Sequence, residues 1–444
     1  MANILDLIEI PYKNEIRGNI DLPDNIDKTV IEWTSSDPET VCPVNVGNKK
    51  AGVVKRGDVD KKVVLTVRVK TGSDVDVKAF VVNVLKKPEE IKEEDYAGYL
   101  FGHFIGEEDE NGEQIYFAVS EDGLNFKDMN GGKPVVISNI GEKGVRDPYI
   151  CRSAEGDRFF LIATDLSIYH RGGWHLNEQG YYDPSTTGSQ YLVFSESTDL
   201  INWSEPRLID VAPKNAGMAW APEMVYSEET GEYVIFFSSS IMDPVTKYKA
   251  KPNAIYYVTT RDFIHFSDTK LFIDNQTDGA KDGKPREIID TTILRINDTY
   301  YAASKDGDNA EKNGGIRIHK NKNLLDPDGW VKVLDLDELG IDISKTDLTA
   351  LDNSMLEGPE LFKYNKKDWS DANVPEYGLI ADQFQLGTGY IPFKTTDIED
   401  AKNSKNSWRM LDESQYSFDK LKKRHGTILN ITKKELENIK TKLG

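Results

Sequence analysis

The sequence predicts an all-β protein in which a small immunoglobulin-like β-sandwich precedes a five-bladed β-propeller. A short motif recurs five times at nearly even spacing between residues 146 and 428. Strand-like runs rich in aromatic and β-branched residues follow the first four copies. The first 88 residues lack this repeat and alternate apolar with polar residues instead. Together these observations predict two β domains of different kinds.

The five copies of the motif define the propeller. They are Arg146-Asp147-Pro148, Trp220-Ala221-Pro222, Ile289-Asp290-Thr291, Glu357-Gly358-Pro359 and Arg424-His425-Gly426. Their second positions lie 74, 69, 68 and 67 residues apart. A repeat of this length indicates repeated supersecondary units, and four strands per unit are typical of a propeller blade.

The fifth blade is split between the two ends of this region. Residues 98–130 carry three strand-like runs without a motif, and the last motif has no strands after it. We therefore expect strand 424–430 to pair with 98–104 and to close a domain spanning 98–432. Such closure removes open sheet edges. Residues 433–444 follow a threonine cap and predict a short final helix.

The N-terminal segment, residues 1–88, predicts the smaller domain. Alternating valines in 63–70 and 75–84 flank a turn at 71–74, which is a hairpin pattern with one buried face. The run Trp-Thr-Ser-Ser-Asp-Pro at 33–38 resembles bacterial immunoglobulin-like modules. Residues 89–97 are charged and without periodicity, so they predict a linker.

Composition and charge limit the classes of binding partner that the protein can have. The net charge of −20 over 444 residues argues against nucleic acid, and no run has the length of a membrane-spanning helix. We expect a monomer that acts on a neutral ligand. The first residues show no signal-peptide pattern. We expect a secreted or cell-surface bacterial protein whose signal peptide has been removed. A cytoplasmic location is the alternative.

Three motif copies carry a carboxylate: Asp147, Asp290 and Glu357. If the motifs point to one axis, these side chains converge there. Cleavage of a glycosidic bond needs one acid for the leaving oxygen and one base for water. A third carboxylate can raise the pKa of the acid by its charge. A single motif of this kind is most often only a turn, but three in register favour a catalytic site.

The order Asp-Pro, Trp-Ala-Pro, Ile-Asp, Glu-Gly-Pro, Arg-His-Gly resembles glycoside hydrolase family 43 over residues 98–432. The resemblance implies an inverting enzyme acting on arabinans, xylans or galactans. It implies that Asp147 is the general base, Asp290 the residue that modulates the acid's pKa, and Glu357 the general acid. Two departures are the Ile-Asp-Thr-Thr run in the third motif and Glu223, which stands where aspartate is usual.

Further residues are expected around the pocket. The predicted sugar contacts are Trp220, Arg146, Lys305, Gln383 and Arg424. A core tryptophan is an equally good interpretation of Trp220. Two roles stay open for His425: it lies near a central structural calcium, as the resemblance implies, or it is a neutral imidazole hydrogen-bonded across the channel. No cofactor is required for the chemistry itself.

The leading functional hypothesis is an inverting exo-glycosidase that acts on side chains of plant cell-wall polysaccharides or on oligosaccharides, with α-L-arabinofuranosidase as the expected activity. β-Xylosidase and exo-β-galactanase are alternatives, because the three carboxylates do not encode the sugar. The fructan-cleaving five-bladed enzymes fit less well, since the chain lacks their Trp-Met-Asn-Asp-Pro and Glu-Cys motifs. The alternative of another class is a carbohydrate-binding propeller without catalysis.

Overall fold

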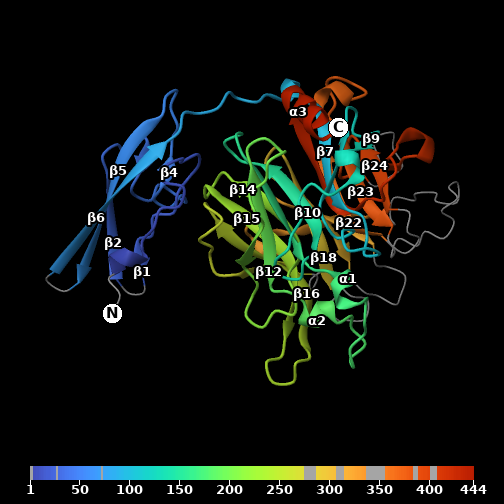
Figure 1. Ribbon diagram of the computed structural model, residues 1–444, viewed down its shortest axis with the longest axis horizontal. Helices are drawn as coiled ribbons and strands as arrows, with labels where there is room; N and C mark the ends of the chain where they lie inside the picture. Colours follow the sequence, from blue (N-terminus) through green and yellow to red (C-terminus); the bar gives the residue numbers. More distant parts are fainter. Residues whose placement is uncertain are drawn as a thin grey trace.

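The computed structural model describes residues 4–26, 29–71, 74–274, 287–306, 315–336, 356–383, 389–400 and 408–444. Strands dominate these residues, as the sequence predicts (Figure 1). None of the helices in the described ranges is long and apolar enough to cross a membrane.

The N-terminal module consists of a four-stranded sheet in the order β1 (Asn25–Ile26), β2 (Thr29–Ser35), β5 (Lys61–Thr71) and β6 (Asp74–Val84), and a two-stranded sheet of β3 (Val41–Cys42) and β4 (Val53–Val54). The short helix η1 (Ile4–Leu7) precedes them. Strands β5 and β6 form the predicted hairpin, although positions 72 and 73 of its turn lie outside the described residues. Trp33 and Leu65 belong to a buried core of the module's own.

The rest of the described chain contains five four-stranded sheets, each with antiparallel neighbours. The first two are β10 (Val145–Arg152), β11 (Phe159–Asp165), β12 (Tyr191–Ser197), β13 (Arg207–Asp210), and β14 (Trp220–Ser227), β15 (Glu232–Met242), β16 (Lys249–Thr260), β17 (Lys270–Ile273). The next two are β18 (Ile288–Ile296), β19 (Thr299–Asp306), β20 (Ile316–Asn321), β21 (Val331–Asp335), and β22 (Leu356–Lys363), β23 (Tyr377–Gln383), β24 (Gly389–Thr395), β25 (Arg409–Met410).

The fifth sheet joins the two ends of this region. Its order is β26 (Arg424–Thr432), β7 (Tyr96–Phe104), β8 (Tyr116–Ser120) and β9 (Phe126–Asp128). Thr427 lies opposite Gly102, and Asn430 lies opposite Tyr99. The predicted pairing of 424–430 with 98–104 is therefore confirmed. The first strands of the five sheets contact one another in a closed cycle, from β10 through β14, β18, β22 and β26 back to β10.

Each first strand begins with a β-bulge in its repeated motif. The pairing register shifts between Arg146 and Tyr149, Trp220 and Glu223, Ile289 and Thr292, Glu357 and Glu360, and Arg424 and Gly426. In the first four motifs the second residue has a positive φ of 49°, 46°, 51° and 51°. This conformation is strained for residues other than glycine and tends to be kept at functional sites. The bulges place the second motif residues at matching positions of their sheets.

The fifth motif differs in conformation. Its bulge spans one residue rather than two, and His425 is not among the residues with positive φ. The amide of Gly426 donates to the Tyr390 hydroxyl at 2.7 Å, and a side chain on Gly426 would meet the Gly102 carbonyl oxygen at 2.1 Å. This close backbone pairing with β7 leaves less room for the wider bulge. His425 thus lies at the second position of its motif, as the corresponding residues of the other four motifs do, but in a different backbone conformation.

Two helical features complete the fold. The helices α1 (Ile168–Arg171) and α2 (Pro184–Thr187) interrupt the connection between β11 and β12. The last helix, α3 (Lys433–Leu443), follows the N-cap residue Thr432, whose side chain accepts from the Glu435 amide in a capping box. This confirms a predicted C-terminal helix, and Figure 1 shows it beside β7.

Candidate active site

The bulged motifs bring carboxylates from three sheets to one histidine. Nδ1 of His425 lies 3.3 Å from Oδ1 of Asp147. The charges of Asp147, Asp290 and Glu357 all act on this imidazole. The three residues that the sequence singled out therefore gather around His425, although they are far apart in the chain.

Asp147 is held as a charged carboxylate. Its Oδ2 accepts a 2.7 Å hydrogen bond from the Thr164 hydroxyl, which also accepts from the Ala221 amide at 2.8 Å. Burial raises the pKa of Asp147, but the hydrogen bond and charge of His425 outweigh it, so this pKa lies below its usual value. Thr164 thus ties the start of the first sheet to the start of the second.

His425 is the cationic centre of the site. Burial lowers its pKa, yet the bond to Asp147 and the three surrounding carboxylates raise it to about 9. A pKa in this range favours the protonated imidazole near neutral pH. Among the described residues, no group of three or more acidic, histidine or cysteine side chains has the arrangement of a metal site. The calcium near His425 stays a prediction from the resemblance.

Asp290 is buried, with 8% of its surface exposed. Its Oδ2 accepts from the Gly358 amide at 3.2 Å, and its own amide donates to the Ser238 hydroxyl at 3.1 Å. Burial is the main cause that raises the pKa of Asp290 to about 6. The charge of His425 opposes this rise, while Glu357 and Asp147 add to it. Asp290 thus links the third motif to the fourth.

Gly358 explains why one motif lacks a side chain at the bulge. Its φ is +51°, and a Cβ there would lie 2.6 Å from Cγ of His425. Only glycine leaves room for the imidazole at this position. The Glu-Gly-Pro motif therefore carries its carboxylate one residue earlier than the Asp motifs do.

Glu357 lies between two cations. Its Oε1 accepts from an Arg424 Nη at 3.1 Å, and Nζ of Lys305 lies 3.7 Å from its Oε2. Its side chain is 23% exposed, so the carboxyl is open to a ligand. The predicted residues Arg424 and Lys305 therefore lie at the site.

The two motif arginines lie on the same aromatic ring. The guanidinium of Arg146 is 4.6 Å from the centre of the Phe104 ring, and that of Arg424 is 5.4 Å from it. Arg146 pairs with Glu113 at 2.9 Å instead of pairing with Asp147. Glu113 also accepts from the first amides of α1, so it anchors the insertion between β11 and β12.

Two tryptophans form an aromatic edge near these arginines. Trp220 is half-buried and meets the ring of Trp174 edge-on at 6.5 Å. Trp174 is 38% exposed, and its indole N–H donates to Glu107 at 3.1 Å. Arg146 lies 5.5 Å from the Trp174 ring centre. Trp220 is therefore neither a fully buried core residue nor an open platform, and Trp174 offers the more accessible ring.

Sequence reasoning missed Asp382 and chose its neighbour Gln383. Asp382 lies opposite Glu357 in the sheet, whereas Gln383 lies opposite Leu356. Lys305 occupies the matching position of the third sheet, opposite Ile289. Counting the register back from each motif would have found Asp382. Glu107, which contacts both arginines and Trp174, lies outside every motif and carried no such signal.

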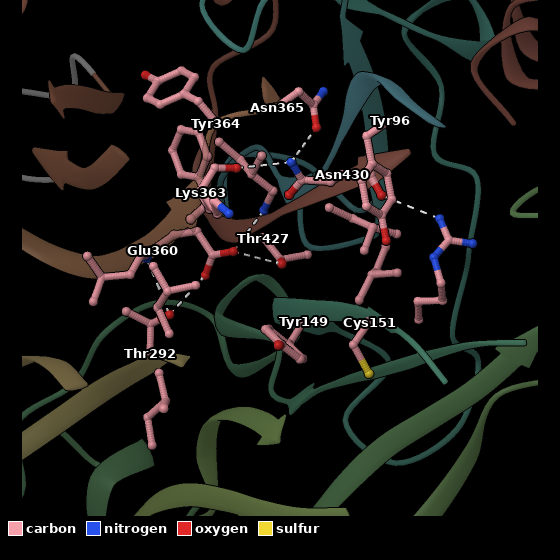
Figure 2. Close-up of a pocket in the computed structure, with 18 of the residues that line it drawn as sticks. Tyr96, Tyr149, Cys151, Thr292, Glu360, Lys363, Tyr364, Asn365, Thr427 and Asn430 are labelled. Carbon is pink, nitrogen blue, oxygen red and sulfur yellow. Dashed lines mark hydrogen bonds between the residues drawn. The ribbon is translucent and has the colours of Figure 1, made fainter. Parts of the chain in front are cut away.

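A separate cavity of about 290 Å³ lies farther along the same first strands (Figure 2). Its lining includes Glu360, Thr292 and Thr427 but none of the three predicted catalytic carboxylates. Glu360 accepts from the Thr427 hydroxyl at 2.9 Å and the Thr292 hydroxyl at 3.2 Å. Burial and the neighbouring Glu360 raise the pKa of Glu223. The unusual Glu223 thus belongs to this second acidic pair and not to the candidate active site.

Comparison with known proteins agrees with the motifs. Residues 94–437 match the model of a family related to glycoside hydrolase family 43, described as "Probable glycosyl hydrolase domain". The chain belongs to this family. Residues 6–87 match a second model, the atrophied bacterial Ig domain. The resemblance found from the five motifs and from the Trp-Thr-Ser-Ser-Asp-Pro run is therefore confirmed.

Relatives of this family-43-related chain include a curated α-L-arabinofuranosidase of Bifidobacterium longum, 30% identical over 422 residues that cover 86% of this chain and 36% of that protein. The chain spans about a third of that relative's length. Similar solved structures include an endo-1,4-β-xylanase from Bacteroides thetaiotaomicron, with 12% identity, coverage of 71% and 91%, and a TM-score of 0.45. An α-L-arabinofuranosidase from Lactobacillus brevis has 16% identity, coverage of 63% and 74%, and a TM-score of 0.39.

Proposed function

We propose that the five four-stranded sheets are the blades of a β-propeller and that its active site lies where the first strands begin. The closed cycle of first strands supports this architecture. The repeated bulges support it too, because each lies in the motif at the start of a first strand. The domain spans 98–432, with 1–88 as the immunoglobulin-like module and 89–97 as the linker.

The proposed reaction is inverting hydrolysis of a glycosidic bond at the end of an oligosaccharide or polysaccharide side chain. Asp147 is the general base, Glu357 the general acid, and Asp290 the residue that modulates the acid. The observation that carries this proposal is the gathering of these carboxylates from three sheets around His425. The lowered pKa of Asp147 keeps it ionised, which is the state in which a carboxylate can accept a proton from water.

The proposed sugar is an α-L-arabinofuranosyl unit. Support comes from the curated relative, whose name is α-L-arabinofuranosidase. Arg146, Arg424, Lys305 and Trp220 are the proposed sugar contacts, and Gln383, opposite Leu356 on β23, is kept as a further proposed contact. Trp174 adds an accessible ring to this group. The net charge of −20 disfavours nucleic acid as a partner, and the proposed reaction involves no membrane. We propose that the chain acts as a monomer.

A panel of aryl glycosides tests the function. The purified chain is expected to release p-nitrophenol from the α-L-arabinofuranoside faster than from the β-D-xyloside or β-D-galactoside. Asp147→Asn controls for a contaminating hydrolase, since it should abolish the release. Faster turnover of the xyloside or galactoside would move the assignment to β-xylosidase or exo-β-galactanase. Sugar binding without any turnover would favour a non-catalytic carbohydrate-binding propeller.

The stereochemistry is a separate test. An inverting pair leaves room for water, with carboxyl groups roughly 6.5–9.5 Å apart, against about 5–5.5 Å in a retaining pair. We therefore expect the first sugar released to have the opposite anomeric configuration to the substrate. Proton NMR of the early product measures this, and retention of configuration would contradict the roles given to Asp147 and Glu357.

A further inference from the structure

Glu357 has surroundings that oppose its proposed role. A general acid must hold its proton until the leaving oxygen needs it. Arg424 and Lys305 both approach this carboxyl, and nearby positive charge favours loss of the proton. Negative charge close to Glu357 must offset these cations if the residue is to act as an acid.

Asp382 supplies such a charge from the neighbouring strand. It lies directly opposite Glu357 in the β22–β23 pairing and has no exposed surface. Its Oδ2 accepts from Nε of Arg424 at 2.5 Å, while a terminal nitrogen of the same guanidinium donates to Glu357 at 3.1 Å. The guanidinium of Arg424 is thus shared between two carboxylates. Its Nε donates to Asp382 and one of its terminal nitrogens donates to Glu357.

We propose that Asp382 is a positioning residue. It fixes Arg424 and offsets the positive charge that Arg424 brings to Glu357, so that Glu357 keeps its proton during catalysis. The proposal rests on the proposed function of this site. It adds to that function a fourth carboxylate that no motif contains.

The other charged groups around Glu357 define what the loss of Asp382 would do. Lys305 approaches from β19, Asp290 from β18, and Asp147 and His425 from β10 and β26. Glu107 lies 3.5 Å from the far nitrogen of Arg424. Without the charge of Asp382, Arg424 has Glu357 as its nearest carboxylate. Glu357 would then lose its proton at a lower pH.

Asp382 is charged in the pH range in which its charge is needed. Burial raises its pKa to about 6, against the lowering effect of Arg424. Above this pH Asp382 is ionised, and this is the range in which a general acid must resist deprotonation. Asp382→Asn removes the charge while it keeps an oxygen that can accept from Arg424.

The kinetic test compares the pH profiles of kcat/KM in wild type, Asp382→Asn and Glu376→Gln. The high-pH limb reports loss of the proton from the acid. In Asp382→Asn its midpoint is expected to fall by about one pH unit, as removal of a near charge does. Glu376 is a matched control, because it is buried at the other end of the same strand pair and bonds Lys394 at 2.7 Å. Glu376→Gln should lower Tm without moving the limb.

A second readout does not depend on turnover. The carboxyl carbon of Glu357, labelled with carbon-13 and assigned by its loss in Glu357→Gln, reports its own titration by NMR. Its midpoint should fall in Asp382→Asn and stay in place in Glu376→Gln. An unchanged midpoint in Asp382→Asn would overturn the role of Asp382, even in an active enzyme. A lowered midpoint in a protein that hydrolyses no glycoside would keep that role and reject the proposed function instead.

Discussion

Glu357 and Asp147 carry the proposed reaction, and a pair of substitutions separates their roles. Glu357→Gln should lower kcat for natural oligosaccharides by roughly 10²- to 10⁴-fold, because their leaving oxygen needs a proton. Activated aryl glycosides leave without that proton, so the same variant should retain most of its activity on them. Asp147→Asn should impair both substrates alike, since water activation is lost. Steady-state rates on matched substrates measure this.

The opposite pattern would reassign these two residues. If Glu357→Gln hydrolyses natural oligosaccharides at the wild-type rate, then another group is the acid. Asp290 is the first candidate for that role, because burial raises its pKa to about 6. If Asp147→Asn retains activity on aryl glycosides, the base lies elsewhere.

His425 makes stability depend on pH in a defined direction. Its pKa is raised from 6.5 to about 9 in the folded protein by the carboxylates around it. Between these values the folded state keeps a proton that the unfolded chain releases, so the free energy of unfolding falls as pH rises. The loss approaches about 3 kcal/mol by pH 9, on the scale of 1.36 kcal/mol per pKa unit.

Chemical denaturation at a series of pH values measures this effect. His425→Gln, which carries no titrating group, should remove most of the slope between pH 6.5 and 9. Equal slopes in the variant and in wild type would show that the proton of His425 is not linked to folding.

At the scale of the strand, the bulged starts depend on residues that tolerate a positive φ. Gly358→Ala should cost about 1–2 kcal/mol for the left-handed conformation alone. It should also displace His425, because the new Cβ would lie 2.6 Å from the ring. Gly131→Ala is the control, since Gly131 has a φ of +60° and nothing within 4 Å of its missing Cβ. Both variants should lose stability, but only Gly358→Ala should lose activity.

The strands also show which parts of the fold and of the site can be predicted from the sequence. The five motifs revealed the five sheets, the closure by β26 and the three carboxylates, because each depends on local pattern and spacing. Asp382 was missed because it has no motif of its own and reaches the site only through cross-strand register. The charge of His425 could not be predicted either, since it depends on how closely Asp147, Asp290 and Glu357 approach, which spacing does not encode.

At the scale of the whole molecule, the N-terminal module is fixed to the sheets that follow it. Arg261 is buried, and its guanidinium donates to the carbonyl oxygens of Ala51 at 2.6 Å and Ile20 at 3.1 Å. A second contact joins Arg56 to Asp157 at 2.7 Å. These bonds cross between the module and the first two sheets. The module is therefore packed against the larger domain in addition to being joined to it by the linker.

Arg261 should consequently stabilise the whole chain and not merely its own loop. Arg261→Ala leaves buried carbonyls of the module without their donor, and each such group costs about 1–3 kcal/mol.

Arg295→Ala is the control, because Arg295 forms an exposed pair with Glu228 at 3.0 Å, and such pairs contribute about 0–1 kcal/mol. Thermal unfolding should show a clearly lower Tm for Arg261→Ala only. Its aryl-glycoside activity well below Tm should stay close to wild type, because the guanidinium of Arg261 donates to backbone carbonyls of residues 20, 50, 51 and 230 and to none of the proposed catalytic carboxylates. Equal Tm values for the two variants would mean that the contact with the module adds little to stability.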